Sequence, residues 1–388
     1  MQCVSLHYGN HTGILISNKT MQTISFPKNK QDQFYKELRG RVNQYFKENE
    51  ISRHANFNMV VKTIFMLGLY ITPFVLLMTV IDNVWLSLLF WALSGVGMAG
   101  IGLSIMHDAN HGAYSKNKIV NDILSKTMIL LGGSDVNWRI QHNVLHHTYT
   151  NVSNHDEDID APSFLLRFDP NKKRNKLHRF QFIYAWPIYG LMTLLWFFTK
   201  DYQATVRYKK KNLFATQRIS LAKHWTLLIL SKAVYAFVFI ALPIWLAPGP
   251  WYVALLGFFL MQFIAGLILA LIFQPAHVIP DTNFPIPDSN GQLEEEWAVH
   301  QLLTTANFAP KSRIFSWYVG GLNFQIEHHL FPNICHIHYK KISKIVKETA
   351  QDYHLPYYCN KTFFHALKAH GKMLRILGRE DIARTATT

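Results

Sequence analysis

Four long apolar runs constrain this chain more than any other feature of its sequence. They lie at residues 57–81, 84–106, 225–247 and 251–274. Each is long enough to cross a bilayer, which takes about 20 mostly apolar residues in a helix. A backbone that crosses hydrocarbon has to satisfy its own hydrogen bonds, so the runs predict four transmembrane helices.

The four runs form two pairs. Only Asp82-Asn83 separates the first pair, and Pro248-Gly249-Pro250 separates the second. Connectors this short force antiparallel hairpins, so the sequence predicts an all-α integral membrane protein built on two helical hairpins. A fifth apolar run at 182–198 contains a proline and a glycine. We interpret it as an interfacial or half-buried helix rather than a span.

The charge distribution predicts the orientation. The chain has 39 Lys and Arg against 24 Asp and Glu, a formal net charge of +15, and neither short connector contains a Lys or Arg. Positive residues near span ends stay in the cytoplasm, so both termini and the middle polar segment should be cytoplasmic. No basic stretch is organised as a nucleic-acid-binding motif. Three cysteines are too few for a disulfide scaffold.

The predicted spans divide the chain into three parts. Residues 1–56 form a cytoplasmic N-terminal helical segment, and residues 351–388 form a cytoplasmic C-terminal tail. Between them, residues 57–350 form a membrane domain with a helical cap on the cytoplasmic side. We expect that cap to carry the chemistry, because the histidines cluster there.

The histidine clusters have the spacing of metal ligands. Positions i and i+4 share one face of a helix, so His107 and His111 can bind one metal ion. His142 and His146 can do the same, while His147 points about 100° round towards a second ion. Eight imidazoles and one amide suit two metal ions better than one. The predicted metal-site residues are His107, His111, His142, His146, His147, His277, Gln325, His328 and His329.

Other polar residues near the clusters are candidates to hydrogen-bond to these ligands and so orient them. They are Asp108, Asp156, Glu327 and His300. The histidines outside the clusters are expected to be ordinary surface or interfacial residues; they are His7, His11, His54, His178, His224, His354, His365 and His370. His336 and His338 receive little weight, because Pro332 should end the helix before them.

The order of the clusters, HDxxH, then HxxxHH, then QxxHH, resembles that of the integral-membrane fatty acid desaturases. Residues 141–151 look like the second box of that family and residues 323–332 like the third. Gln325 in place of the usual first histidine is similar to the front-end, delta-6-type branch, which acts on linoleoyl-CoA or acyl-lipid substrates. Enzymes of that branch insert a double bond between an existing one and the carboxyl end. The resemblance covers roughly residues 50–350.

The resemblance implies a non-haem centre of two iron ions, with O2 as co-substrate, that removes two hydrogens from an acyl chain. That chain would be carried on CoA or on a membrane lipid. By position, the seven box histidines match the family's ligands, Gln325 matches the replaced ligand, and His277 matches an extra histidine after the fourth span. Phe273 departs from the pattern, because a family relative has Asn four residues before that histidine.

The source of electrons is a second departure. Many front-end desaturases are fused to a cytochrome b5 domain with a His-Pro-Gly-Gly haem motif, and this sequence contains no such motif. We therefore expect a separate donor, a ferredoxin or a free cytochrome b5, which the basic cytoplasmic face would attract. The absence of a fused carrier and of an evident retention signal favours a bacterial inner membrane.

Two alternatives stay open on the sequence. A membrane di-iron fatty acid or lipid hydroxylase uses similar histidine boxes. A metal-binding membrane transporter would place polar or ionisable residues along its spans to form a pathway, and here only Lys62 and Lys232 interrupt the spans.

Overall fold

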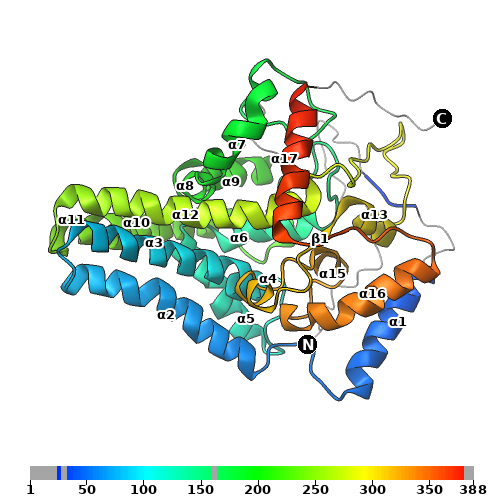
Figure 1. The fold of residues 1–388 in the computed structure, drawn as a ribbon, viewed down its shortest axis with the longest axis horizontal. Helices are drawn as coiled ribbons and strands as arrows, with labels where there is room; N and C mark the ends of the chain where they lie inside the picture. The colour runs from blue at the N-terminus through cyan, green and yellow to red at the C-terminus, as the bar shows by residue number, and fades with distance from the viewer. Residues whose placement is uncertain (1–23, 28–32, 160–163, 380–388) are drawn as a thin grey trace.

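The computed structural model describes residues 24–27, 33–159 and 164–379. Over these residues the chain is mostly helical, and four helices are long and apolar enough to cross a membrane. The predicted all-α membrane fold with four spans is therefore confirmed. The spans lie side by side in one half of the molecule, and the other helices gather in a cap at one end of them (Figure 1).

The first hairpin consists of α2 (Phe57–Thr79) and α3 (Val84–Gly100). Asn56 and Asn83 cap these helices, because each side chain accepts a hydrogen bond from the first turn. Helix α3 continues into η1 (Ile101–Met106) and α4 (His107–Asn110), so the second span covers Val84–Asn110. It therefore passes the predicted end at residue 106 and includes the first histidine of the HDxxH cluster.

The second hairpin consists of α10 (Leu221–Ala236), η7 (Phe237–Ala241) and α11 (Leu242–Leu246), followed by α12 (Trp251–His277). Helix α12 also passes its predicted end, residue 274, and finishes at His277. Two of the predicted metal ligands are thus carried directly by membrane-spanning helices.

Small residues let α3 pack closely between α2 and α12. A Cβ atom on Gly95 would lie 2.7 Å from the Met261 carbonyl oxygen of α12. A Cβ atom on Gly97 would lie 2.5 Å from the backbone nitrogen of Tyr70 on α2. Membrane helices associate largely through such close packing. The position of the two histidine-bearing helix ends relative to each other is therefore set inside the bilayer.

The fifth apolar run folds as a bent pair of helical segments, Leu177–Tyr189 and Met192–Lys210, with a 72° bend between them. Gly190 lies at the bend, where a Cβ atom would meet the Phe263 ring of α12 at 2.3 Å. Glycine is therefore needed for this approach. The interfacial placement of the run stays a prediction. Its parts are η4 (Leu177–Phe180), α7 (Gln181–Tyr189), α8 (Met192–Leu195), η5 (Trp196–Lys200) and α9 (Asp201–Lys210).

The cap is built from short helices and one pair of two-residue strands. Its elements are α1 (Gln33–Glu48), α5 (Lys118–Ser125), η2 (Lys126–Leu131), α6 (Asp135–Trp138), η3 (Arg139–His146), η6 (Leu213–Thr216), α13 (Trp297–Thr304), β1 (Asn307–Phe308), α14 (Arg313–Tyr318), α15 (Gln325–Leu330), η8 (His336–His338), α16 (Tyr339–Asp352), β2 (Cys359–Asn360) and α17 (Phe363–Arg379). Strands β1 and β2 pair in parallel. Helix α1 buries Phe34, Leu38, Val42 and Phe46, spaced four residues apart, in one cluster with α15 and α16.

Three histidines that the sequence predicted at the surface or interface are buried, namely His178, His224 and His370. His370 donates from Nδ1 to the Val278 carbonyl oxygen at 2.8 Å and accepts from the Tyr189 hydroxyl at 2.6 Å. This contact fastens α17 to α7 and to the end of α12. The prediction was wrong because the sequence does not reveal which elements α17 covers. His7 and His11 lie outside the described residues.

Lys232, inside the third span, is buried with a complete set of acceptors. Its ammonium group donates to the Gly132 and Trp196 carbonyl oxygens and to the Asp201 carboxylate. A charge inside a membrane protein is tolerated when it is paired in this way. Lys232 therefore has a structural partner and gives no support to a transport pathway.

Replacing Lys232 with methionine should lower the thermal stability of the purified protein. The change leaves the Asp201 carboxylate buried without its counter-charge, and breaking such a pair costs about 3 to 5 kcal/mol. The double variant Lys232→Met with Asp201→Asn should recover most of the loss. Thermal unfolding in detergent micelles measures both effects, and a double variant as unstable as the single one would contradict this account.

Candidate metal centre

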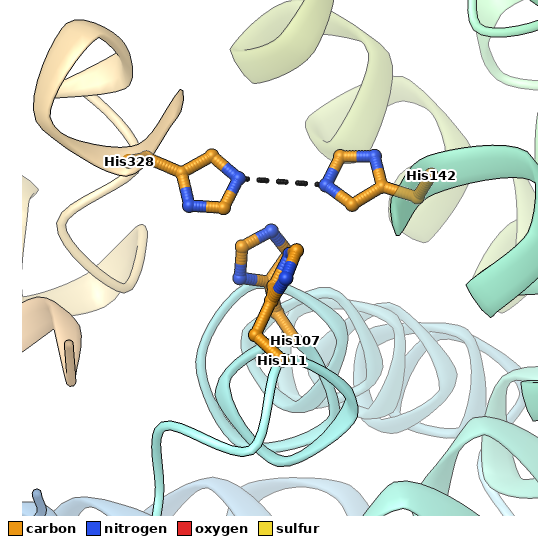
Figure 2. Close-up of side chains that lie close together, drawn as sticks. All are labelled: His107, His111, His142 and His328. Carbon is orange, nitrogen blue, oxygen red and sulfur yellow. Dashed lines mark hydrogen bonds between the residues drawn. The ribbon is translucent and has the colours of Figure 1, made fainter. Parts of the chain in front are cut away.

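The structure brings the predicted histidines of all three boxes together in two adjacent groups. His107, His111, His142 and His328 form the first group, and His146, His277 and His329 form the second. In each group, every histidine offers one ring nitrogen atom, and these atoms all lie within 4.8 Å of one another. In Figure 2, His142 and His328 face each other across the first group while His107 and His111 approach from the helix below.

The two groups draw on helices that are far apart in the chain. His107 lies in the last turn of the second span and His277 ends the fourth, while η3 supplies the middle box and α15 the third. His328 and His142 approach to 3.4 Å between their Nε2 atoms, the contact drawn in Figure 2. The ring of His146 lies 4.8 Å from those of His277 and His329, centroid to centroid.

The middle box lies on η3, which is π-helical. The backbone N–H of His147 donates to the His142 carbonyl oxygen at 3.0 Å, a bond from residue i+5 to residue i. In this wider turn His147 also lies next to His142, with 3.2 Å between their Nε2 atoms. His146 contributes to the second group and, with His142 and Asp158, to a further one. The pairing of His142 and His146 on one ion stays a prediction; π-helical turns are frequent at functional sites.

Two carboxylates orient the middle box from outside. His142 donates from Nδ1 to Asp158 at 2.8 Å, and His146 donates from Nδ1 to Asp156 at 3.0 Å. A carboxylate only accepts, so the proton of each ring is held on Nδ1 and the lone pair on Nε2. Asp156 was among the predicted orienting residues. Asp158 was not singled out, although it lies in the same acidic stretch.

Neutral acceptors do the same for the second group. His277 donates from Nδ1 to the Thr304 carbonyl oxygen at 3.1 Å, and His329 donates from Nδ1 to the Gln301 side-chain oxygen at 2.8 Å. Both acceptors come from α13. Neither acceptor could be recognised in the sequence, because a backbone carbonyl or a single glutamine carries no motif.

Many of the inward-facing nitrogen atoms have nothing to bond to. Buried polar atoms in proteins are nearly always hydrogen-bonded, so a cluster of unmatched ones needs an explanation. A metal ion coordinated by imidazole nitrogen would supply the missing partner, and this donor set suits Fe, Zn, Cu or Ni. Among the predicted metal-site residues, the buried atoms without a partner are both ring nitrogens of His107, Nδ1 of His147, Nε2 of His111, His277 and His329, and Nε2 of Gln325.

Burial also keeps the ring nitrogens free of protons. It lowers the pKa of His142 to about 4, despite the opposing effect of Asp158. Burial and the neighbouring histidines hold the pKa of His328 and of His329 well below the usual range. At neutral pH these imidazoles are therefore uncharged, the state in which they bind metal ions.

The remaining predicted orienting residues have other partners. Asp108 accepts from His336, and its distance to the Nδ1 atom of His107 is 3.9 Å. Glu327 accepts from Asn307 and from the Tyr357 hydroxyl, and burial raises its pKa to about 7.

The hydrogen bonds of Glu327 to Asn307 and Tyr357 thus anchor α15 to β1. Neither bond involves a histidine of the two groups. His300 belongs to neither group, and its ring stands edge-on to Phe26 at 5.4 Å.

Two aromatic rings lie against the first group. The ring of Trp138 lies 4.4 Å from that of His142 and 5.5 Å from that of His107. Phe273 of α12 stands 6.3 Å from His107 and 6.1 Å from His142. The position where a family relative has Asn is therefore an apolar wall in this chain.

Comparison with known proteins agrees with this geometry. The family model described as fatty acid desaturase matches residues 83–361, more than half of the chain. The sn-1 linoleoyl-lipid 6-desaturase of Arthrospira platensis is 36% identical over 345 residues, which cover 88% of this chain and 92% of that protein. The acyl-lipid (8-3)-desaturase of Physcomitrium patens is 35% identical, over 92% of this chain and 74% of its own length. The sn-1 linoleoyl-lipid 6-desaturase of a Synechocystis species is 35% identical, over 89% and 96%.

The spans, the buried histidine groups and these matches lead to one assignment: the chain belongs to the fatty acid desaturase family.

Proposed function

We propose that the chain is an acyl-lipid desaturase that inserts a double bond between an existing double bond and the carboxyl end of an acyl chain. The observation that carries the proposal is the pair of adjacent imidazole groups at the ends of membrane spans, within reach of an acyl chain in the bilayer. The names of the relatives from Arthrospira and Physcomitrium specify a lipid-linked substrate. They support a membrane lipid, rather than CoA, as the acyl carrier.

In this proposal two iron ions occupy the two histidine groups. When bound, they supply the activation of O2 that removal of hydrogen from an unactivated methylene requires and that no side chain provides. The proposed ligands are the predicted set, His107, His111, His142, His146, His147, His277, His328 and His329, with Gln325 as a further candidate. The unmatched buried nitrogen atoms support this choice.

The protein's own contribution is orientation and shielding. Four acceptors keep protons on the outer ring nitrogens, so the inner lone pairs stay directed at the centre. They are Asp156, Asp158, Gln301 and the Thr304 carbonyl oxygen. The two carboxylates also offset part of the positive charge that two cations bring. The ring of Trp138, only 7% exposed, keeps water away from the first group.

The centre and both termini are proposed to face the cytoplasm. The absence of Lys and Arg from the two short connectors supports this orientation. Electrons would come from a separate ferredoxin or cytochrome b5, drawn by the basic charge of the polar segments. The relatives from Arthrospira and Synechocystis support a bacterial membrane as the location.

Expression in a host fed linoleate should produce a fatty acid with one additional double bond on the carboxyl side of the existing pair. Mass spectrometry of derivatised products, taken separately from the lipid and acyl-CoA pools, locates both the bond and its carrier. The product should appear first in membrane lipid. A hydroxylated product would contradict desaturation, and a product that appears first as acyl-CoA would contradict the lipid carrier.

The purified protein should contain about two irons per chain, held by nitrogen ligands. His146→Ala should remove at least one of them and abolish desaturation, because it deletes a ligand of the second group. The variant should still insert in the membrane. Metal analysis and product assays check both, with His365→Ala, an exposed histidine of α17, as the matched control. Full activity in His146→Ala would rule out this ligand set.

Asp158→Ala should weaken iron binding or activity about tenfold to hundredfold, because His142 loses the acceptor that fixes its tautomer. Asp158→Asn should lose less, since its amide oxygen still accepts from Nδ1. Competition with a chelator measures iron affinity, and Asp122→Ala on the exposed face of α5 serves as the control. Equal iron affinity in Asp158→Ala and the wild-type protein would show that the contact does not orient His142.

A further inference from the structure

Lys62, the charged residue inside the first span, has a buried partner far away in the chain. Its side chain lies in the second turn of α2 and is 2% exposed. The ammonium group approaches the Nε2 atom of His336 to 2.7 Å and lies 5.3 Å from the centre of the Trp317 ring. An ammonium only donates, so His336 accepts at Nε2 and carries its own proton on Nδ1.

That proton points at the first histidine box. The Nδ1 atom of His336 donates to Asp108 at 2.8 Å, and the backbone N–H of His336 donates to the same carboxylate oxygen at 3.2 Å. Asp108 directly follows His107, and its other oxygen lies 3.9 Å from the Nδ1 atom of His107. Lys62, His336 and Asp108 thus form a continuous buried triad that ends beside a proposed ligand.

Close backbone packing holds the segments around the triad in place. Gly321 has a positive φ of 65°, and a Cβ atom there would lie 2.9 Å from the His336 carbonyl oxygen. The adjacent Gly320 has a φ of 63°, and a Cβ atom there would lie 2.1 Å from the carbonyl oxygen of Leu103 in η1. This double-glycine turn therefore wedges between the segment that precedes the first box and the segment that carries His336.

The chemistry of the triad argues against a third metal ion. Asp108, Cys335 and His336 are close enough together to hold one. However, the Nε2 atom of His336 already faces the Lys62 ammonium, and its Nδ1 atom is bonded to Asp108. The positive charge at this position is thus supplied by Lys62. Removing it would leave a buried carboxylate without a counter-charge, which is strongly unfavourable.

We propose that Lys62 is a positioning residue for the metal centre: through His336 it fixes Asp108, and Asp108 holds in place the turn of α4 that carries His107. The inference rests on the proposed function, since it assumes that His107 binds metal. It assigns a role in the centre to a lysine of a membrane span and to a histidine that follows the third box. The triad joins α2, α4 and η8, so it also fixes the third-box region against the first box.

Metal titration of the full-length protein tests the proposal without relying on turnover. Metal-free protein in detergent is titrated with Co²⁺, whose optical spectrum reports the ligand geometry. Lys62→Met should weaken Co²⁺ binding about tenfold to hundredfold and alter the spectrum. Lys232→Met is the matched control, because it removes a buried lysine from another span that pairs with Asp201 instead of a histidine box. Its folded fraction should bind Co²⁺ like the wild-type protein.

Two further variants separate positioning from folding. His336→Gln can still accept from Lys62 and donate to Asp108, so it should keep most of the Co²⁺ affinity. His336→Leu breaks the same contacts from outside the span, so it should reproduce the loss and replaces Lys62→Met if that variant does not accumulate. In the double variant Lys62→Met with Asp108→Asn, the second change should add little, because the two residues act as a unit.

Wild-type Co²⁺ affinity and spectrum in Lys62→Met and in His336→Leu would overturn the proposal. An equal loss in Lys62→Met and Lys232→Met would also overturn it, because general destabilisation would then explain the effect. If the wild-type protein bound no Co²⁺, the metal centre itself would be refuted together with the triad's role. A loss confined to the triad variants is the result that we expect.

Discussion

The continuation of two membrane helices into the histidine groups is the constraint on which the rest of the structure depends. The second span ends in the HDxxH box, and the fourth ends at His277. A helix in hydrocarbon satisfies its own backbone hydrogen bonds, so each of these spans stays helical up to its end. Close contacts at Gly95 and Gly97 fix α3 against α12 and α2. The membrane spans therefore determine where the HDxxH box and His277 lie, and the cap supplies the remaining histidines.

The cap completes the centre by supplying acceptors as well as ligands. Four imidazoles have their outer nitrogen bonded to an atom that can only accept, as His142 does to Asp158 and His277 does to the Thr304 carbonyl oxygen. A ring held in this way has one tautomer and one direction for its lone pair. The acceptors outside the rings therefore determine the directions of the lone pairs inside the centre. The burial that excludes water also keeps the rings neutral.

Sequence periodicity was enough to predict the four spans and the residues that gather at the centre, because both depend on local rules of length and spacing. It failed where those rules change. The π-helical turn of η3 brings His147 next to His142, a contact that a regular α-helix does not predict. Asp158 was not named individually within its acidic stretch, and Gln301 was missed because a single glutamine has no motif. His336 received little weight because Pro332 separates it from the third box, and its partner Lys62 is 274 residues away, a separation that no local pattern bridges.

The two lysines buried in the spans differ in when their partners are synthesised. Asp201 precedes Lys232 by 31 residues, so that pair can form as soon as the third span enters the membrane. Lys62 inserts with the first span, whereas His336 is made only after all four spans. Its place in the second turn of α2 lets the ammonium reach the headgroup region in the meantime. The charge of Lys62 therefore has no His336 to pair with until the chain beyond the third box has been synthesised.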